Sequence, residues 1–88
     1  MTSGATKLEF TRHAVRVMAE RDISMEWVER VVAAPALRSP DSNDPAVERF
    51  FGRIAERDGR ALRVVVNTNA TPWRVVSVFF DRNMRKKP

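Results

Sequence analysis

The spacing of apolar residues changes once along the chain, at a segment that contains three prolines, "PALRSPDSNDP" at residues 35–45. Before this segment, apolar residues recur at the three- and four-residue spacing of amphipathic helices. After it come three runs rich in β-branched and aromatic residues, which are typical of strands: "AVERFFGRIAER", "RALRVVVNTN" and "WRVVSVFFD". Proline and small polar residues predict a connecting loop over residues 35–45. The chain therefore divides into a helical half and a strand-forming half.

The first half begins with a short strand and continues with two helices. "TKLEFT", residues 6–11, alternates apolar and polar side chains as a half-buried strand does. The Thr11 hydroxyl can cap a helix that runs to about Arg21, and Ser24 can cap a second helix, "SMEWVERVVAA". Pro35 lacks a backbone donor and ends that helix. The apolar stripe of the first helix is Ala14, Val15, Val17 and Met18, and the predicted buried face of the second is Trp27, Val28, Val31 and Val32.

The second half predicts two consecutive hairpins, because "DG" at 58–59 and "ATP" at 70–72 separate its three strands. The resulting order, βααβββ, is an α+β fold in which two N-terminal helices pack on one face of a mostly antiparallel sheet. A chain of 88 residues is long enough for one compact domain. We therefore predict a single domain over residues 1–88, with an ordered core at about 6–82 and a basic tail at 83–88.

The chain is strongly basic, with 16 Lys and Arg residues against 11 Asp and Glu and a formal net charge of +5. Such a surface attracts polyanions, with RNA and DNA first among them, and an acidic protein would be drawn to it as well. The chain has no cysteine and one histidine, so we expect no disulfide, no metal site and no cofactor. No stretch has the apolar length of a signal peptide or a membrane span. We therefore expect a cytoplasmic protein without a membrane partner, and we leave the oligomeric state open.

Strand parity predicts which side chains share the sheet face away from the helices. The most apolar sets should face the helices, namely Phe50 and Ile54 in one strand and Leu62, Val64 and Val66 in the next. The opposite face then carries Arg49, Arg53, Arg63 and Asn67. These groups could converge on a phosphate backbone, since a guanidinium binds phosphate at two points. The alternative is a solvated face on which Glu48 and Glu56 neutralise the arginines. The parity of the last strand stays open, because its two faces are about equally apolar.

His13, the one histidine, lies in "FTRHAVRV", where the first helix is predicted to begin. An imidazole titrates near neutral pH and serves as a general acid or base, typically for a rate gain of about 10²- to 10⁴-fold. In RNA cleavage the 2′-hydroxyl is an internal nucleophile, so a protein has to position the phosphate, stabilise its charge and move protons. A histidine and several arginines would meet these needs without a metal. The structural alternative is a residue of the first helical turn, or a half-buried imidazole bonded to the backbone.

Three segments, "FTRHAVRVMAERDISMEWVERVVAAP", "ERFFGRI" and "RALRVVV", resemble in this order the motifs of a group of small bacterial domains of unknown function. The resemblance extends from about Lys7 to Phe80. In layout this group is similar to the RelE/ParE superfamily and especially to BrnT-type toxins, which are ribonucleases neutralised by a DNA-binding antitoxin. The resemblance implies a βααβββ fold and metal-independent cleavage of RNA, with His13, Arg53 and Arg63 at motif positions. The chain departs from RelE-type toxins in having no tyrosine, a residue type that they use in catalysis.

These observations predict a toxin-like, metal-independent endoribonuclease of a toxin–antitoxin type system, which binds RNA on the open basic face of its sheet. His13 is the predicted proton-transfer group, and Arg53 and Arg63 are the predicted catalytic phosphate ligands. Further nucleic-acid contacts are predicted at Arg12, Arg49, Asn67, Arg82 and Lys86. The expected partners are RNA and an acidic or DNA-binding antitoxin protein. The competing interpretation is a non-catalytic module of the same fold that binds nucleic acid or protein through the same face.

Overall fold

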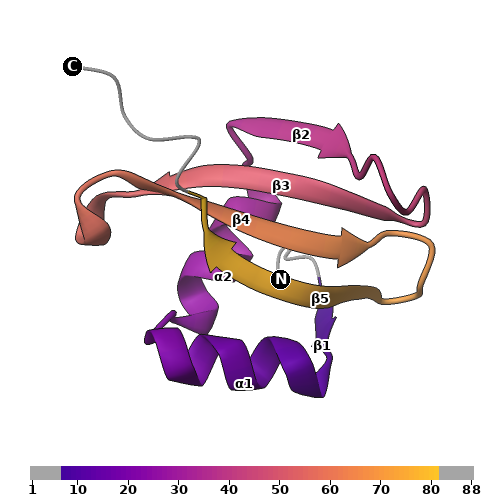
Figure 1. Ribbon diagram of the computed structural model, residues 1–88, viewed down its shortest axis with the longest axis horizontal. Coiled ribbons are helices and arrows are strands. Elements are labelled where there is room, and N and C mark those ends of the chain that lie inside the picture. Colours follow the sequence, from indigo (N-terminus) through magenta and orange to yellow (C-terminus); the bar gives the residue numbers. More distant parts are fainter. Residues whose placement is uncertain (1–6, 82–88) are drawn as a thin grey trace, which may run out of the picture.

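The computed structural model describes residues 7–81, in which two helices pack against one face of a five-stranded mixed sheet (Figure 1). The predicted α+β class is confirmed. The predicted ends of the ordered core, residues 6 and 82, and the predicted tail at 83–88 lie outside the described residues. The elements are β1 (Leu8–Phe10), α1 (Arg12–Arg21), α2 (Met25–Ala33), β2 (Leu37–Pro40), β3 (Val47–Ile54), the 3-10 helix η1 (Ala55–Arg57), β4 (Arg60–Asn67) and β5 (Trp73–Phe80). Within this range, neither α-helix is long and apolar enough to cross a membrane.

Thr11 joins the start of α1 to β5. Its Oγ1 accepts a hydrogen bond from the Ala14 N–H at 3.1 Å, and the same hydroxyl donates to the Val76 carbonyl at 3.1 Å. The Thr11 N–H donates to the Val75 carbonyl at 3.0 Å. The predicted N-cap is therefore confirmed, and the cap also fixes α1 against the sheet. Ala14 and Met18 then pack α1 onto the core.

Ser24 caps α2, as predicted, by accepting a hydrogen bond from the Glu26 N–H at 3.0 Å. The buried residues of α2 are Val28, Val31 and Val32. This helix passes close to β3 at Gly52, where a Cβ atom would lie 3.0 Å from a methyl carbon of Val31. A residue without a side chain at this position lets α2 approach the sheet.

Strands β3, β4 and β5 form the predicted antiparallel meander, and the sheet order is β1-β5-β4-β3-β2. The "DG" pair closes the first hairpin after the turn of η1. Asp58 and Gly59 have φ values of 60° and 73°, which lie in the left-handed region. Glycine adopts this region freely, and aspartate adopts it more readily than most other residues. β1 lies parallel to β5, so the first strand of the chain pairs with the last.

The prediction of a connecting loop over residues 35–45 is wrong for part of that segment. Residues Leu37–Pro40 form β2, which pairs antiparallel with β3, and the Ala36 N–H donates to the Phe51 carbonyl at 2.8 Å. Pro40 is tolerated because β2 is an edge strand, on which one side needs no backbone donor. The observed order is therefore βααββββ. The β2 segment has four residues and ends in proline. Its alternation of apolar and polar side chains is too short to distinguish a strand from a loop by sequence.

The core lies between the helices and the sheet. The inward residues predicted for β3 and β4 are confirmed, since all are 0% exposed: Phe50, Ile54, Leu62, Val64 and Val66. β5 contributes Val75 and Val78, which are three residues apart. The alternation is interrupted by a bulge, because the neighbours Val65 and Val66 pair with Ser77 and Val75. An extra residue in β5 is the reason that parity alone did not reveal its inward face.

Arg57, just after β3, fastens the far end of α1. Its Nη2 donates to the carbonyls of Asp22 at 2.8 Å and Arg21 at 3.3 Å, so the guanidinium satisfies acceptors at the helix C-terminus. The same guanidinium lies 5.2 Å from the centre of the Trp27 ring and 5.4 Å from that of Phe80. One side chain thus connects α1, α2 and β5.

Replacing Arg57 with alanine is expected to lower the free energy of unfolding by about 1–2 kcal/mol, because a charged donor and two cation–π contacts are lost. Its side chain is 29% exposed, which keeps the loss below that of a fully buried group. Arg57→Lys should retain only part of this stability, because an ammonium group lacks the planar set of N–H donors of a guanidinium. Denaturant unfolding followed by circular dichroism measures the effect. Arg60→Ala is the control, because Arg60 contacts the Phe80 ring without capping a helix; equal losses would contradict the capping role.

Candidate nucleic-acid interface

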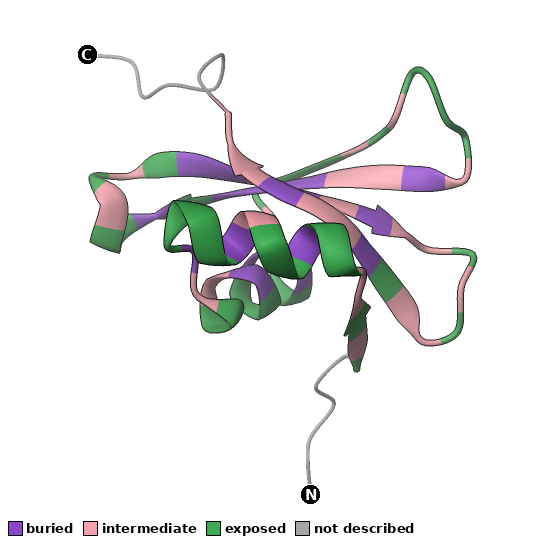
Figure 2. Ribbon diagram, turned by 60° about the horizontal axis from the view of Figure 1, so that its bottom comes forward, coloured by how far each residue is buried: buried purple, intermediate pink, exposed green. Residues whose placement is uncertain are grey.

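Both helices of residues 7–81 lie on the same side of the sheet, and we call the other side the open face (Figure 2). The strand register determines which side chains share it, because residues paired across neighbouring strands point to the same side. The open face comprises Glu9, Leu37, Ser39, Val47, Arg49, Phe51, Arg53, Ala61, Arg63, Val65, Asn67, Arg74, Ser77 and Phe79.

Three arginines lie close together on the open face. Arg49 and Arg53, the β3 arginines, are four residues apart on one strand. Arg63 of β4 pairs with Phe51, which lies midway between them. Arg63 is therefore the diagonal neighbour of both β3 arginines, an arrangement that separates residues by about 7–8 Å. The three arginines share this face, as strand parity predicts, with Phe51 between them in the register.

The β3 arginines are oriented by backbone carbonyls. Arg53 Nη1 donates to the Gly59 carbonyl at 2.9 Å, and Arg49 Nη2 donates to the Pro40 carbonyl at 3.3 Å. Arg49 Nε is buried and has no hydrogen-bond partner among the described residues. A guanidinium carries five N–H donors, so each of these side chains retains donors for a ligand. Side chains that are ordered before binding lose less entropy when a ligand arrives.

Arg63 is held by aromatic rings and a carboxylate. Its guanidinium lies 4.3 Å from the centre of the Phe79 ring and 5.9 Å from that of Phe51. Its Nε lies 3.4 Å from Oδ2 of Asp81, which balances part of the positive charge. The Arg63 side chain is 21% exposed, so only part of its guanidinium is accessible to a ligand.

Glu48 and Glu56, which could have neutralised the open face, are paired elsewhere. Oε1 of Glu48 lies 2.8 Å from Arg38 Nη2, and Oε1 of Glu56 lies 3.1 Å from Arg30 Nη1. The hydrogen bonds from these two guanidinium groups lower the pKa of each carboxyl below its ordinary value. Within residues 7–81, the β3 arginines form no ion pair with a carboxylate. The interpretation that Glu48 and Glu56 neutralise this face is therefore wrong.

His13 is not on the open face. It is an exposed residue in the first turn of α1, next to Ala14, which is fully buried on the helix-bearing side of the sheet. Arg53 and Arg63 lie on the opposite side, so the structure does not bring the three predicted catalytic residues together. The sequence could not settle this point, because the cap at Thr11 fixes where the helix begins and not which side of the sheet it covers.

The other predicted nucleic-acid contacts are distributed over different parts of the chain. Asn67 lies on the open face at the end of β4, where its Oδ1 accepts a hydrogen bond from the Asn69 N–H at 2.9 Å. Arg12 is exposed on α1, away from the open face. Arg82 and Lys86 lie outside the described residues. The group of predicted residues on the open face is therefore smaller than predicted. The face also carries Arg74, whose Nη2 lies 3.5 Å from Oε1 of Glu9.

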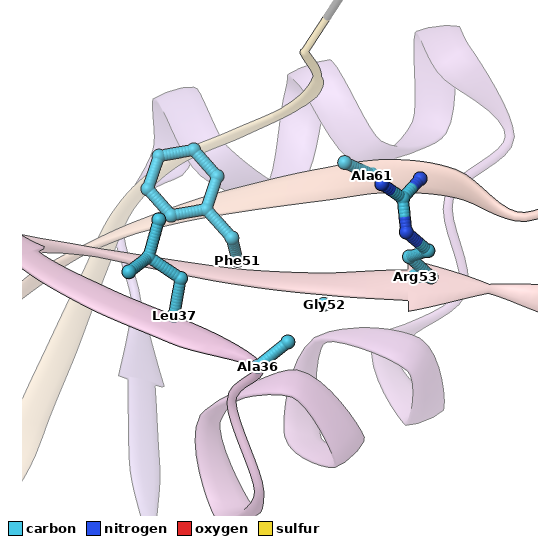
Figure 3. A pocket seen from close by; sticks show the side chains of 6 residues that line it. All are labelled: Ala36, Leu37, Phe51, Gly52, Arg53 and Ala61. Carbon is cyan, nitrogen blue, oxygen red and sulfur yellow. The ribbon is translucent and has the colours of Figure 1, made fainter. Parts of the chain in front are cut away.

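Beside Arg53 the open face has a hollow of about 160 Å³ (Figure 3). It is lined by Ala36, Leu37, Phe51, Gly52, Arg53 and Ala61. Leu37, one of these lining residues, is 46% exposed. Sequence reasoning missed this feature, because one wall comes from β2, which was predicted as loop. The alternation of Leu37 with Ser39 was the one available signal.

The chemistry of the open face is that of an anion-binding surface with aromatic rings. It presents guanidinium donors beside Phe51 and Phe79, and Asp81 is the carboxylate that contacts one of the three arginines. In the described part of the chain, no three His, Cys, Asp or Glu residues form a group that could hold a metal ion. Guanidinium groups bind phosphate oxygens through paired N–H donors, so a phosphodiester is the ligand that this surface suits best.

Fold and site together define a small basic α+β domain with an arginine-bearing sheet face. Residues 10–80 match the family described as "Domain of unknown function (DUF4258)", and the chain belongs to this family. The resemblance to a group of domains of unknown function is thereby confirmed. No curated protein and no solved structure matches the chain, and nothing in these comparisons links it to the RelE/ParE superfamily or to BrnT-type toxins.

Proposed function

We propose that this protein binds RNA through the open face, with Arg49, Arg53 and Arg63 as ligands of the phosphate backbone. The observation that carries the proposal is the strand register that brings these three arginines together on the open face, two of them without a carboxylate partner among the described residues. The net charge of +5 adds a long-range attraction for polyanions. The resemblance to ribonuclease toxins favours RNA over DNA as the ligand.

Endoribonuclease activity in a toxin–antitoxin type system is the more specific proposal. Support comes from the chemistry of RNA cleavage, in which the 2′-hydroxyl attacks the neighbouring phosphate. A protein surface that positions this phosphate and neutralises its charge meets two of the requirements of the reaction. The proton-transfer role proposed for His13 would have to act from the other side of the sheet. We therefore rank RNA binding first and RNA cleavage second. An acidic segment of an antitoxin protein would compete with RNA for the same arginines.

The experiment measures binding of a fluorescein-labelled RNA to the full chain over a range of salt concentrations. Three phosphate contacts predict a slope of about −2 for log K against log [salt], since each contact with a single strand contributes about −0.7. His13→Ala should bind RNA as the parent does, because this side chain is exposed on the helix side. Absent binding, or binding that does not respond to salt, would refute the proposal.

The cleavage proposal is decided by incubating the same RNA with the parent, His13→Ala and Arg53→Ala, and separating the products on a denaturing gel. Cleavage that is lost in both variants would support the ribonuclease mechanism with His13 as the proton-transfer group. RNA that is bound and remains intact would establish the non-catalytic module.

A further inference from the structure

The hollow beside Arg53 lies within the arginine group. Figure 3 shows the Leu37 and Phe51 side chains on one side of it and the Arg53 guanidinium on the other. Phe51 also contacts the Arg63 guanidinium, at 5.9 Å from its ring centre. The hollow is therefore flanked by one phosphate ligand of the proposed interface and separated from a second by a single phenyl ring.

The hollow exists because short side chains alternate with long ones. Ala61 pairs with Arg53 across β3 and β4, and Ala36 precedes the edge strand β2. Neither methyl group fills the space between the longer side chains of Leu37, Phe51 and Arg53. A volume of about 160 Å³ is enough for one planar ring, because an engineered protein cavity of about 150 Å³ binds benzene. Leu37 and Arg53 are exposed, so an aromatic ring can pack on the leucine and stack on the guanidinium, while Phe51, which is 6% exposed, contributes a smaller part of the wall.

We propose that the hollow receives one unstacked nucleobase, and that the RNA bound by the open face is therefore single-stranded; this inference rests on the proposed function. The charge of the surroundings selects this occupant, since Arg53 lines the hollow itself and Arg63 lies behind Phe51, where the phosphates of the strand would pass. In a duplex the bases are paired and stacked, so none is available to enter a hollow between side chains. An apolar side chain of another protein would use the leucine wall and leave the guanidinium groups without a partner.

The test compares three labelled ligands on the full chain at one salt concentration: a single-stranded RNA of twelve nucleotides, the same sequence as a duplex, and a strand of equal length whose sugars lack bases. We expect the single strand to bind about tenfold more tightly than the abasic strand, because base stacking on side chains contributes roughly that much per base. The duplex should also bind more weakly than the single strand. Both weaker ligands keep the phosphates that the arginines bind.

Two variants locate the effect. Ala36→Leu fills the hollow without a change of charge, and Leu37→Ala removes a wall; both should weaken binding of the single strand and leave binding of the abasic strand unchanged. Val15→Leu is the matched control, because Val15 is 50% exposed on α1, on the other side of the sheet. Thermal unfolding of each variant shows whether it is folded. A variant that does not fold is replaced by Ala61→Ser, which makes the floor of the hollow polar with little change in size.

The outcomes separate the two proposals. Equal affinities for all three ligands, or affinities unaffected by Ala36→Leu, would overturn the base-binding hollow and leave the arginine interface intact. No binding of any of the three ligands would overturn the proposed function itself, and the inference with it. If the parent self-associates and Ala36→Leu abolishes this without affecting RNA binding, the occupant is a second copy of the chain and the inference is wrong.

Discussion

Reversing the charge of both β3 arginines, Arg49→Glu together with Arg53→Glu, is expected to weaken RNA binding by about a hundredfold or more. Each guanidinium loses charge-assisted hydrogen bonds to phosphate, which contribute about 1.5–3 kcal/mol apiece, and each carboxylate then repels the backbone. Both side chains reach solvent from an outward-facing position, so the fold should tolerate the change. Fluorescence anisotropy with a labelled single-stranded RNA measures the affinity, and circular dichroism verifies the fold.

The matched control is Arg12→Glu together with Arg16→Glu. These two arginines are also four residues apart and exposed, but they lie on α1. Each pair of reversals removes the same charge, so general attraction to a polyanion falls equally in both double variants. We expect the α1 variant to lose far less affinity than the β3 variant. Equal losses would show that RNA is attracted by overall charge and that the open face is not the interface.

Phe50→Ala is expected to remove about 3–5 kcal/mol of the free energy of unfolding, the range for a large aromatic side chain truncated in a core. Phe50 is fully buried, its ring centre lies 5.8 Å from that of Trp73, and the Arg38 guanidinium lies over it at 4.7 Å. The total free energy of unfolding of a domain of this length is about 4–13 kcal/mol. The variant should therefore be largely unfolded, or its melting temperature should lie at least about 12 °C below that of the parent. Differential scanning calorimetry gives the comparison.

Phe79→Ala is the control for Phe50→Ala, because it makes the same chemical change on the open face. Phe79 is only half-buried and contacts the Arg63 guanidinium, so its truncation leaves no enclosed cavity. The expected loss is below about 2 kcal/mol. If the two variants were equally destabilised, the hydrophobic core would not be concentrated between the sheet and the helices.

Local chemistry explains which features could be predicted from the sequence. Thr11 and Ser24 cap their helices through their own hydroxyl groups, and Phe50 and Ile54 face inward because regular strands alternate. Such signals lie within a few residues of one another. β5 departs from regular alternation at a bulge, and this bulge depends on the pairing of β5 with β4. β2 forms because it can pair with the free edge of β3. Neither cause is visible in the segment that it affects.

The candidate site follows the same division. Arg49, Arg53 and Arg63 were predicted to share a face because parity within two strands suffices to place them. His13 was predicted to act together with Arg53 and Arg63, but its position depends on which side of the sheet α1 covers, and parity does not reveal that side. The hollow was missed altogether, because it requires β2 beside β3 and the short side chains of Ala36 and Ala61 on the two sides of β3. Long-range packing determines all of these features.

The parallel pairing of β1 with β5 sets the order in which the chain can fold. Leu8 pairs with Trp73, and the Thr11 hydroxyl bonds to a carbonyl 65 residues away, so neither contact can form on the ribosome before β5 has been synthesised and released. Contacts between distant residues form late, because the intervening chain must first lose its freedom. The strand that is made first is therefore among the last to be incorporated, because its one partner in the described sheet is the last strand to be made.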